Sequence, residues 1–434
     1  MLKTLMPYLA RTLSSNRLRD TRRYVHEAAR RLQGAPHRLQ VFLRLDDPYS
    51  ALLVQALPDL LERFDIELQF HTVLHLDPSM FPAPEMWRAN AMHDAAHLAH
   101  LYDLPYEPQG WLDDEGAIEA ATAALLEAEG NAERYLRTAH SLFSHFWVQP
   151  SARLGSLPEY NRPSRLEQLA HNERQLREEG HYLSAMIGYG GEWYWGLDRL
   201  DHLERRLIAL GAARQADPEI HYDRTYRDFC RHSPPSARPR LPLVLYWSAR
   251  SPYSYIGLER AVQLAHHYRI ELQIKPVLPM VTRGMAVPKT KKMYIFLDTK
   301  REAEKLGLPY GFVADPLGRA VERCYALVDF AREAGKLEDF LLSFARGVNA
   351  EGIRAETDRG LRKIVERFGL SWHEAREQLR DENWRHWAQQ NLEEMLALGC
   401  WGVPSFRYGD RVFWGQDRIG LIEQAIIGDT LAHN

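Results

Sequence analysis

The sequence predicts an α/β protein built from two similar halves, and three observations support this. The chain has 434 residues, enough for about two or three domains of ordinary size. Four short segments recur 204 residues further along in the same order, which indicates a duplicated domain. Each half also begins with an apolar strand, a proline-containing turn and a helix.

The repeated segments relate the positions of one half to those of the other. Near the ends of the halves the separation grows to 219 residues, so the second half carries about 15 more residues in its middle. The matching segments are Pro48-Tyr49-Ser50 with Pro252-Tyr253-Ser254, Ile66–Gln69 with Ile270–Gln273, Pro84 with Pro288, Leu104-Pro105-Tyr106 with Leu308-Pro309-Tyr310, and, at the longer separation, Trp195–Arg199 with Trp414–Arg418.

Both halves show the same expected order of elements. Strands are expected at 38–45 and 66–73 in the first half, and at 241–248 and 270–277 in the second. For the rest of the second half the pattern predicts helices within 320–345 and 356–366, strands at 404–408 and 411–414, and a helix over 417–427. Strand, helix, strand, helical insertion, hairpin and helix is the order of a thioredoxin fold with a helical insertion.

Composition shifts along the chain predict its domain boundaries. The expected parts are an arginine-rich helical arm over 1–34, a thioredoxin-like domain over 35–211, a linker over 212–240 and a second such domain over 241–434. The linker is polar and carries four prolines, which disfavour regular structure.

Charge and cysteine content narrow the class of protein. The net charge is −3 with both signs mixed, which gives no reason to expect nucleic acid or a membrane as a partner. No apolar run approaches the roughly 20 residues of a membrane span, and Pro7 interrupts the short apolar start, so no signal peptide is expected. Cys230, Cys324 and Cys400 are far apart and form no CxxC pair, so we expect a cytoplasmic protein.

A candidate anion site lies where the second half turns from its first strand into a helix. Ser251 is a favoured N-cap residue, and Pro252 suits the first helical position. The free N–H groups and dipole of a helix N-terminus attract an anion, and the Ser251 hydroxyl could donate to a thiolate. The alternative interpretation is that Ser251 only caps the helix.

Two further segments near the end of the chain are typical of a peptide-like ligand site. Val403 must be extended because Pro404 follows it, and we expect a cis bond between them, which would present the Val403 backbone to an extended ligand. Gln416 and Asp417 are expected at the N-terminus of the last helix, where Asp417 could pair with an amino group. The alternative is that Asp417 is a capping residue.

Together these segments resemble the kappa-class glutathione transferases and the bacterial 2-hydroxychromene-2-carboxylate isomerases, of the DsbA-like branch of the thioredoxin superfamily. The resemblance covers residues 241–430 and implies glutathione as cofactor. The roles it implies are contact with the glutathione sulfur for Ser251, binding of the cysteinyl backbone for Val403 and Pro404, binding of the γ-glutamyl end for Gln416 and Asp417, and contact with the glycyl carboxylate for Lys291. The register leaves Lys289 and Lys292 open for that last role, and the asparagine usual just before this segment is not evident.

The resemblance implies a glutathione-dependent isomerase or transferase that acts on an aromatic or otherwise electrophilic small molecule, without a metal. Two alternatives remain. A DsbA-like thiol oxidoreductase is disfavoured because neither position 251 nor position 254 is cysteine. A non-catalytic binding protein is disfavoured because Ser251, Pro404 and Asp417 occur together. A homodimer and a pseudo-dimer of the two halves are both compatible with the sequence.

The first half lacks the residues that would hold glutathione. Asp47 stands in place of Ser251, Trp87 in place of Lys291, and Ala185 or a neighbour in place of Pro404. A carboxylate would repel a thiolate, so we interpret this half as a catalytically degenerate partner domain. A ligand of its own is the alternative.

Three histidines of the first half could share one helix face. His93, His97 and His100 have the spacing i, i+4, i+7, which would suit a zinc site. Metal sites usually draw ligands from more than one element, so a polar helix face is the preferred interpretation.

Overall fold

The computed structural model describes residues 2–149, 157–234, 239–285 and 287–432, which form two compact units. The N-terminal unit comprises 21–227, and the C-terminal unit comprises 228–434 together with 1–20. The boundary at residue 20 falls within the second of two N-terminal helices, α1 (Leu2–Leu13) and α2 (Asn16–Leu32). In the described part of the chain, no helix has the length and apolar character needed to cross a membrane.

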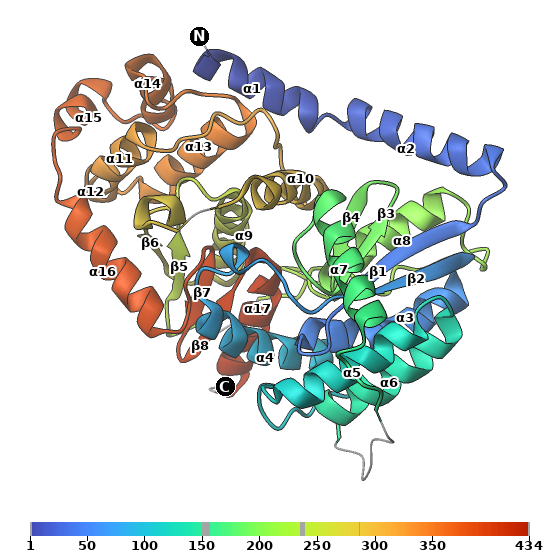
Figure 1. The fold of residues 1–434 in the computed structure, drawn as a ribbon. Helices are drawn as coiled ribbons and strands as arrows, with labels where there is room; N and C mark the ends of the chain where they lie inside the picture. Colours follow the sequence, from blue (N-terminus) through green and yellow to red (C-terminus); the bar gives the residue numbers. More distant parts are fainter. Residues whose placement is uncertain (1, 150–156, 235–238, 286, 433–434) are drawn as a thin grey trace. The chain divides into compact units, whose positions relative to one another are not determined.

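The C-terminal unit contains a mixed sheet of four strands in the order β6-β5-β7-β8 (Figure 1). The strands are β5 (Leu243–Trp247), β6 (Leu272–Pro276), β7 (Ser405–Tyr408) and β8 (Arg411–Trp414). Strand β5 pairs in parallel with β6 and antiparallel with β7, so that Leu245 lies between Ile274 and Phe406. Strand β8 completes the sheet as an antiparallel hairpin with β7.

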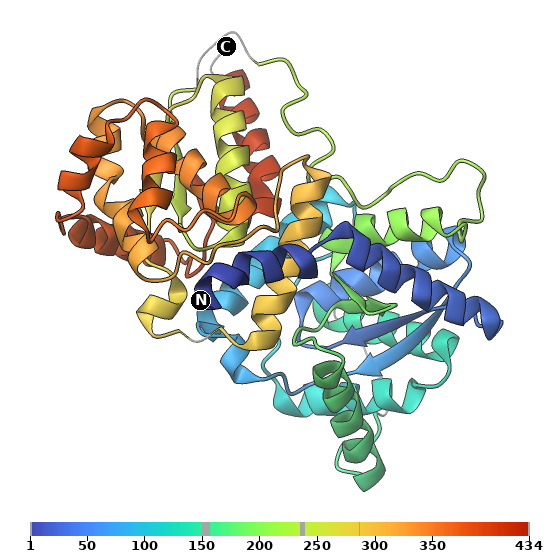
Figure 2. The same ribbon diagram turned by 90° about the horizontal axis from the view of Figure 1, so that it is seen from above.

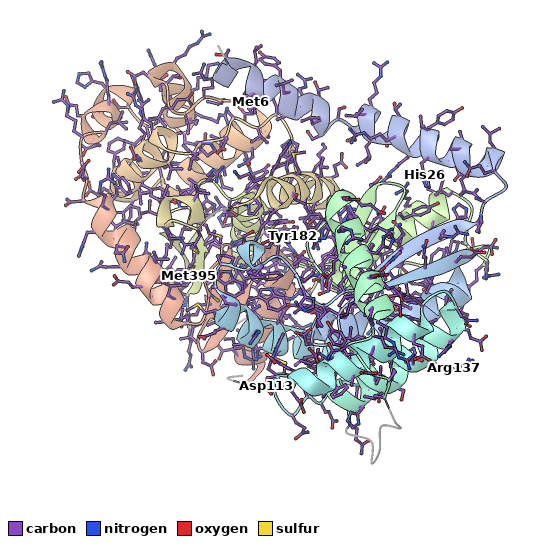
Figure 3. All side chains as sticks on the ribbon, viewed as in Figure 1. Met6, His26, Asp113, Arg137, Tyr182 and Met395 are labelled. Atoms are coloured by element: carbon purple, nitrogen blue, oxygen red, sulfur yellow. The ribbon has the colours of Figure 1, made fainter. Side chains whose placement is uncertain are left out.

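Strand β5 is buried on both faces, and its side chains alternate between two cores. Leu243, Leu245 and Trp247 belong to the core formed with α9 (Pro252–Tyr268) and α17 (Ile419–Ala432), which run side by side in Figure 2. Val244 and Tyr246 face the opposite way and pack with Met395 of α16 (Trp384–Ala397), labelled in Figure 3. Both faces of the strand are covered, so every residue of the segment is apolar, as is usual for a central strand.

Between β6 and β7 the chain forms a helical insertion. The helices before α16 are α10 (Lys289–Lys305), α11 (Arg319–Ala326), α12 (Val328–Glu333), α13 (Leu337–Ala350), α14 (Asp358–Glu366) and α15 (Trp372–Gln378), with the 3₁₀ turn η3 (Met280–Arg283) ahead of them. The predicted helical stretch 320–345 is thus three helices. Gly335 interrupts it with φ 64°, a left-handed conformation that ends α12.

The last predicted helix also begins differently. Instead of starting at Asp417, the chain forms a 3₁₀ turn, η4 (Gln416–Arg418), and α17 follows it from Ile419. Residues 416 and 417 therefore lie in a tight corner after β8.

The N-terminal unit repeats the same sheet, with the order β2-β1-β3-β4 and the same strand directions. Its strands are β1 (His37–Leu43), β2 (Ile66–Thr72), β3 (Met186–Tyr189) and β4 (Glu192–Trp195). Its helices are α3 (Pro48–Arg63), α4 (Pro84–Leu101), α5 (Glu115–Ala128), α6 (Ala132–Trp147), α7 (Pro163–Glu178) and α8 (Leu200–Ala209), with 3₁₀ turns η1 (Pro78–Met80) and η2 (Leu197–Arg199).

Matching hydrogen bonds occur at corresponding positions of the two units. Tyr49 Oη donates to Asp94 Oδ2 at 2.8 Å, and Tyr253 Oη donates to Asp298 Oδ2 at 2.6 Å. Both pairs are 45 residues apart in sequence and join the helix after the first strand to the first helix of the insertion. The repeat in the sequence is therefore also a repeat of contacts.

A second matching pair of hydrogen bonds lies at the start of each hairpin. The Gly196 amide donates to the Ala185 carbonyl at 2.8 Å, and the Gly415 amide donates to the Pro404 carbonyl at 2.9 Å. Ala185 therefore corresponds to Pro404 in the local hydrogen bonding.

Helix α9 packs directly against Pro404. A Cβ atom added at Gly257 would lie only 2.9 Å from Pro404 Cβ and Cγ. The positions that correspond to Gly257 and Pro404 in the N-terminal unit carry Leu53 and Ala185, both fully buried. In the C-terminal unit the helix carries the smaller residue and the loop the larger one, whereas in the N-terminal unit the helix carries the larger. The two pairs of side chains therefore fill a similar total volume with different shapes.

We predict that Gly257→Ala lowers the free energy of unfolding by about 1–3 kcal/mol, because the added methyl group overpacks the contact with Pro404. Gly428 in α17 is the matched control, since a Cβ there would have no atom within 4 Å. Gly428→Ala should leave stability unchanged or raise it by up to about 1 kcal/mol, as alanine favours a helix. Denaturant unfolding measures both, and a Gly257→Ala protein as stable as the wild type would contradict the packing argument.

Candidate functional site

Ser251 caps the N-terminus of α9. Its backbone is extended (φ −78°, ψ 119°), and its Oγ accepts a hydrogen bond from the Ser254 amide at 3.1 Å. Pro252 takes the first helical position, where no amide hydrogen is needed. The half-buried Ser251 hydroxyl thus lies at the positive end of a helix of 17 residues.

The proton of the same hydroxyl points to the hairpin loop. Ser251 Oγ donates to the Val403 carbonyl at 3.2 Å. The peptide bond between Val403 and Pro404 is cis, which confirms the prediction from the sequence. A serine hydroxyl has one proton, so in this arrangement it is committed to the Val403 carbonyl.

Tyr325 fixes the loop that leads into Ser251. Its Oη donates to the Val277 carbonyl at 2.6 Å and accepts from the Ala249 amide at 3.3 Å. The ring is completely buried, and the segment before the helix N-terminus is therefore tied to the chain that leaves β6. Tyr325 could not be predicted from the sequence, because no local pattern marks a contact across 76 residues.

Gln416 and Asp417 adjoin this loop through the hydrogen bond from Gly415 to Pro404. Gln416 is 1% exposed, and its Nε2 donates to Asp417 Oδ1 at 2.6 Å and to Glu302 Oε2 at 3.0 Å. Its Oε1 accepts from Arg260 Nη1 at 3.0 Å. The side-chain amide of Gln416 is thus engaged within the protein, while Asp417 is half-buried.

Lys291 lies on the face of α10 that is joined to the site. Asp298 and Glu302 follow it by 7 and 11 residues, which places all three on one side of the helix. The Tyr253 hydroxyl donates to Asp298, and the Gln416 side-chain amide donates to Glu302.

Of the three candidate lysines, Lys291 alone is half-buried, whereas Lys289 and Lys292 are exposed. Burial lowers the pKa of Lys291 to about 8. A cation that is partly removed from water at this place is suited to a ligand carboxylate, so the geometry favours Lys291 over its two neighbours.

Aromatic side chains surround the backbone of the hairpin loop. The rings of Trp401 and Trp414 lie 4.6 Å apart, and Gly402 between them is so close to Trp414 that a Cβ would lie 2.6 Å from its Nε1. Arg283 Nη2 donates to the Trp401 carbonyl at 3.1 Å. The hairpin loop thus carries aromatic rings on both of its ends, and the Arg283 guanidinium is bound two residues before Val403.

The corresponding place in the N-terminal unit is closed by internal hydrogen bonds. Asp47 is 2% exposed and accepts from the Tyr49 amide at 3.2 Å and from the hydroxyls of Ser50 and Ser184, each at 2.8 Å. Burial raises the pKa of Asp47. Ser184 corresponds to Val403, because it precedes Ala185 as Val403 precedes Pro404. Its hydroxyl donates to Asp47, the residue that corresponds to Ser251.

Other groups singled out in the sequence have local contacts. His97 Nδ1 lies 2.8 Å from the His93 carbonyl in the preceding turn of α4. Throughout the residues that the structure describes, no three histidine, cysteine, aspartate or glutamate side chains are grouped as a metal site requires. Cys324 and Cys400 are buried free thiols, and burial raises the pKa of both.

Comparison with known families agrees with this geometry. Residues 243–427 match the model of the DsbA-like thioredoxin domain. The C-terminal half contains a DsbA-like thioredoxin domain. The match begins at the first residue of β5 and ends within α17, so it includes Ser251, the hairpin loop and the corner at Asp417.

Two curated relatives match part of the chain. A 2-hydroxychromene-2-carboxylate isomerase of Sphingobium xenophagum is 24% identical over 192 residues, which is 42% of this chain and 96% of the relative. A protein of the same name from Pseudomonas putida is 22% identical over 189 residues, 42% of this chain and 92% of the relative.

Solved structures with similarity to the chain include two of particular note. One is a 2-hydroxychromene-2-carboxylate isomerase, with 21% identity and a TM-score of 0.38 over 42% of this chain and 93% of that one. The other is the cytosolic disulfide reductase DsbM of Pseudomonas aeruginosa with GSH, with 17% identity and a TM-score of 0.32 over 43% of this chain and 99% of that one.

Proposed function

We propose that the DsbA-like domain binds glutathione and acts as a glutathione-dependent isomerase or transferase on an aromatic or otherwise electrophilic small molecule. The observation that carries the proposal is the placement of the Ser251 hydroxyl. The hydroxyl lies at the N-terminus of α9, where it accepts a hydrogen bond from the Ser254 amide. It also lies 3.2 Å from the backbone carbonyl of Val403. The names of the two curated relatives support the choice of an isomerase.

The donors and acceptors of the site complement those of glutathione. Lys291 offers a cation for a carboxylate, and Asp417 offers a carboxylate for the α-amino group. The Val403 backbone can pair with the cysteinyl residue as one strand pairs with another. The helix N-terminus and the Ser251 hydroxyl together suit a thiolate. Bound glutathione would supply a sulfur nucleophile that adds to an electrophilic carbon and can leave again.

Ser251 stabilises the thiolate in this proposal and is not itself the nucleophile. In this structure the Ser251 hydroxyl donates its proton to the Val403 carbonyl. A ligand N–H that takes over this carbonyl releases the hydroxyl proton, which can then be donated to the sulfur. A hydrogen bond to a charged group contributes about 1.5–3 kcal/mol, enough to lower a thiol pKa by one or two units.

Thiol–disulfide exchange is the less favoured activity. It needs a reactive cysteine at the start of α9, where this chain has Ser251 and Ser254. Cys324 and Cys400 are buried in the core instead, and a raised thiol pKa makes them poor nucleophiles.

We further propose that the N-terminal unit is a degenerate tandem copy of the same fold. Its identical strand order and its matching tyrosine–aspartate contact support a common origin. The buried Asp47 and its bond to Ser184 fill the position where a thiolate would lie.

The proposal predicts one glutathione site per chain. Calorimetric titration of the full chain with glutathione should give a stoichiometry near one, because only the C-terminal unit offers Ser251, Lys291 and Asp417. Ser251→Ala and Asp417→Asn should each weaken binding by about tenfold or more, since the first removes a hydrogen bond to the thiolate and the second removes the negative charge opposite the ammonium group.

Asp198 is the matched control, because it corresponds to Asp417 in the N-terminal unit. Asp198→Asn should leave the dissociation constant for glutathione unchanged. A stoichiometry of two, or binding that survives Ser251→Ala combined with Asp417→Asn, would refute the proposed site. Turnover of a chlorodinitrobenzene with glutathione then tests the catalytic part, and tight binding without turnover would indicate a binding protein.

A second prediction concerns the pH dependence that Lys291 imposes. Its ammonium form prevails below the pKa of about 8 and is lost as the pH rises through that value. Affinity for S-methylglutathione, which has no thiol to ionise, should therefore fall by about threefold to fivefold between roughly pH 7 and 9.5, since a half-buried ion pair contributes about 1 kcal/mol. Bound carboxylate raises the pKa of Lys291 and shifts the midpoint upward.

Variants of the three lysines separate the candidates. Lys291→Gln should bind more weakly at neutral pH and lose this part of the pH dependence, whereas Lys289→Gln and Lys292→Gln should retain both. The same pH dependence in Lys291→Gln as in the wild type would exclude Lys291 from the carboxylate site.

A further inference from the structure

A charged residue is buried beneath the corner at Gln416. Arg260 of α9 is 4% exposed, and its Nη1 donates to both the carbonyl oxygen of Gln416 at 2.7 Å and Gln416 Oε1 at 3.0 Å. The guanidinium lies over the ring of Phe229, at 4.5 Å. Its Nε and Nη2 are buried and have no hydrogen-bond partner within the described residues.

The arginine belongs to a chain of buried polar contacts that leads to Asp417. Gln416 accepts from Arg260 through Oε1 and donates through Nε2, to Asp417 on one side and to Glu302 on the other. Glu302 is 1% exposed and pairs with Lys305 at 2.8 Å. The orientation of the Gln416 amide is thereby determined, because Arg260 can only donate and the carboxylates can only accept.

The N-terminal unit shows that the fold does not need this chain of contacts. The positions that correspond to Arg260, Glu302, Lys305 and Gln416 carry Ala56, Leu98, Leu101 and Leu197, which all belong to or pack against the apolar core. Buried ion pairs are often no more stable than well-packed apolar residues, and unpartnered buried donors are costly. The polar set therefore occurs in the unit with the proposed ligand residues, and stability alone gives no reason for it.

We propose that Arg260 is a positioning residue that holds Gln416, and through it the Asp417 carboxylate, for recognition of a ligand's free α-amino group. The inference rests on the proposed glutathione site and deepens it, because it assigns selectivity for γ-glutamyl ligands to a residue that does not touch them. Arg260 fixes the backbone of Gln416 and the amide orientation together. Without Arg260 the carbonyl oxygen and Oε1 of Gln416 both lose their donor, so the corner that carries Asp417 is no longer fixed from the side of α9.

The test compares two ligands on the full chain by calorimetry: glutathione and an analogue that lacks the α-amino group. The wild type should bind glutathione about tenfold more tightly than the analogue, as expected for one hydrogen bond to a charged group. Arg260→Met should lose most of this preference, with a weaker affinity for glutathione and an almost unchanged affinity for the analogue. Arg260→Lys keeps one donor and should restore part of the preference. A purely structural role would instead weaken both ligands alike.

A second variant keeps the test decisive if Arg260→Met fails to fold. Arg260→Ala combined with Glu302→Leu, Lys305→Leu and Gln416→Leu reproduces the residues of the N-terminal unit. We expect it to melt near the wild-type temperature and to bind both ligands equally. A retained preference in a folded variant would overturn the positioning role while leaving the glutathione site intact. A wild type that binds neither ligand would overturn the proposed function itself.

Discussion

The contact between helix α9 and the loop at Val403–Pro404 is the constraint on which the site depends. Gly257 lets the helix approach Pro404 closely, and the Ser251 hydroxyl joins the helix N-terminus to the Val403 carbonyl. The same helix carries Arg260, which holds the corner at Gln416. One helix thus brings together the end of β5, the start of the hairpin and the turn into α17, although these segments are far apart in the sequence.

Comparison of the two units separates what maintains the fold from what serves a ligand. Both units keep the sheet order and the tyrosine–aspartate contact between the first helix and the insertion. They differ in two coherent groups of residues. The N-terminal unit has a buried, internally bonded carboxylate at Asp47 and an apolar set around Leu197, whereas the C-terminal unit has a hydroxyl at Ser251 and a polar set around Gln416. The residues of each group depend on one another, because changing one of them alone would leave a buried polar group without its partner.

Local sequence patterns predicted most of the strands and helices, and the helix N-terminus at Ser251. The continuous apolar run Leu243–Trp247 predicts a buried strand, and Ser251 followed by Pro252 predicts a helix N-terminus, because both depend on neighbouring residues only. The predicted cis bond before Pro404 is present. The break at Gly335 was missed, because the apolar residues on either side continue the helical period without interruption.

Long-range contacts could not be predicted in the same way. The sequence places Gln416 only at the N-terminus of the last helix, and its partners Arg260 and Glu302 are 156 and 114 residues away. Its burial follows from their placement on α9 and α10. A signal was nevertheless available, since the 204-residue repeat aligns Arg260 with Ala56 and so marks it as specific to the second half.

The proposed function depends on the Ser251 hydroxyl stabilising a thiolate at the N-terminus of α9. The ultraviolet absorbance of the thiolate, followed against pH with glutathione bound to the full chain, measures the pKa of the bound thiol directly. We expect this pKa to lie below that of free glutathione in the wild type and to rise by about one or two units in Ser251→Ala, because a hydrogen bond to a charged sulfur is lost. A bound thiol that titrates like free glutathione, with no change on Ser251→Ala, would contradict it and would leave Ser251 as a helix cap alone.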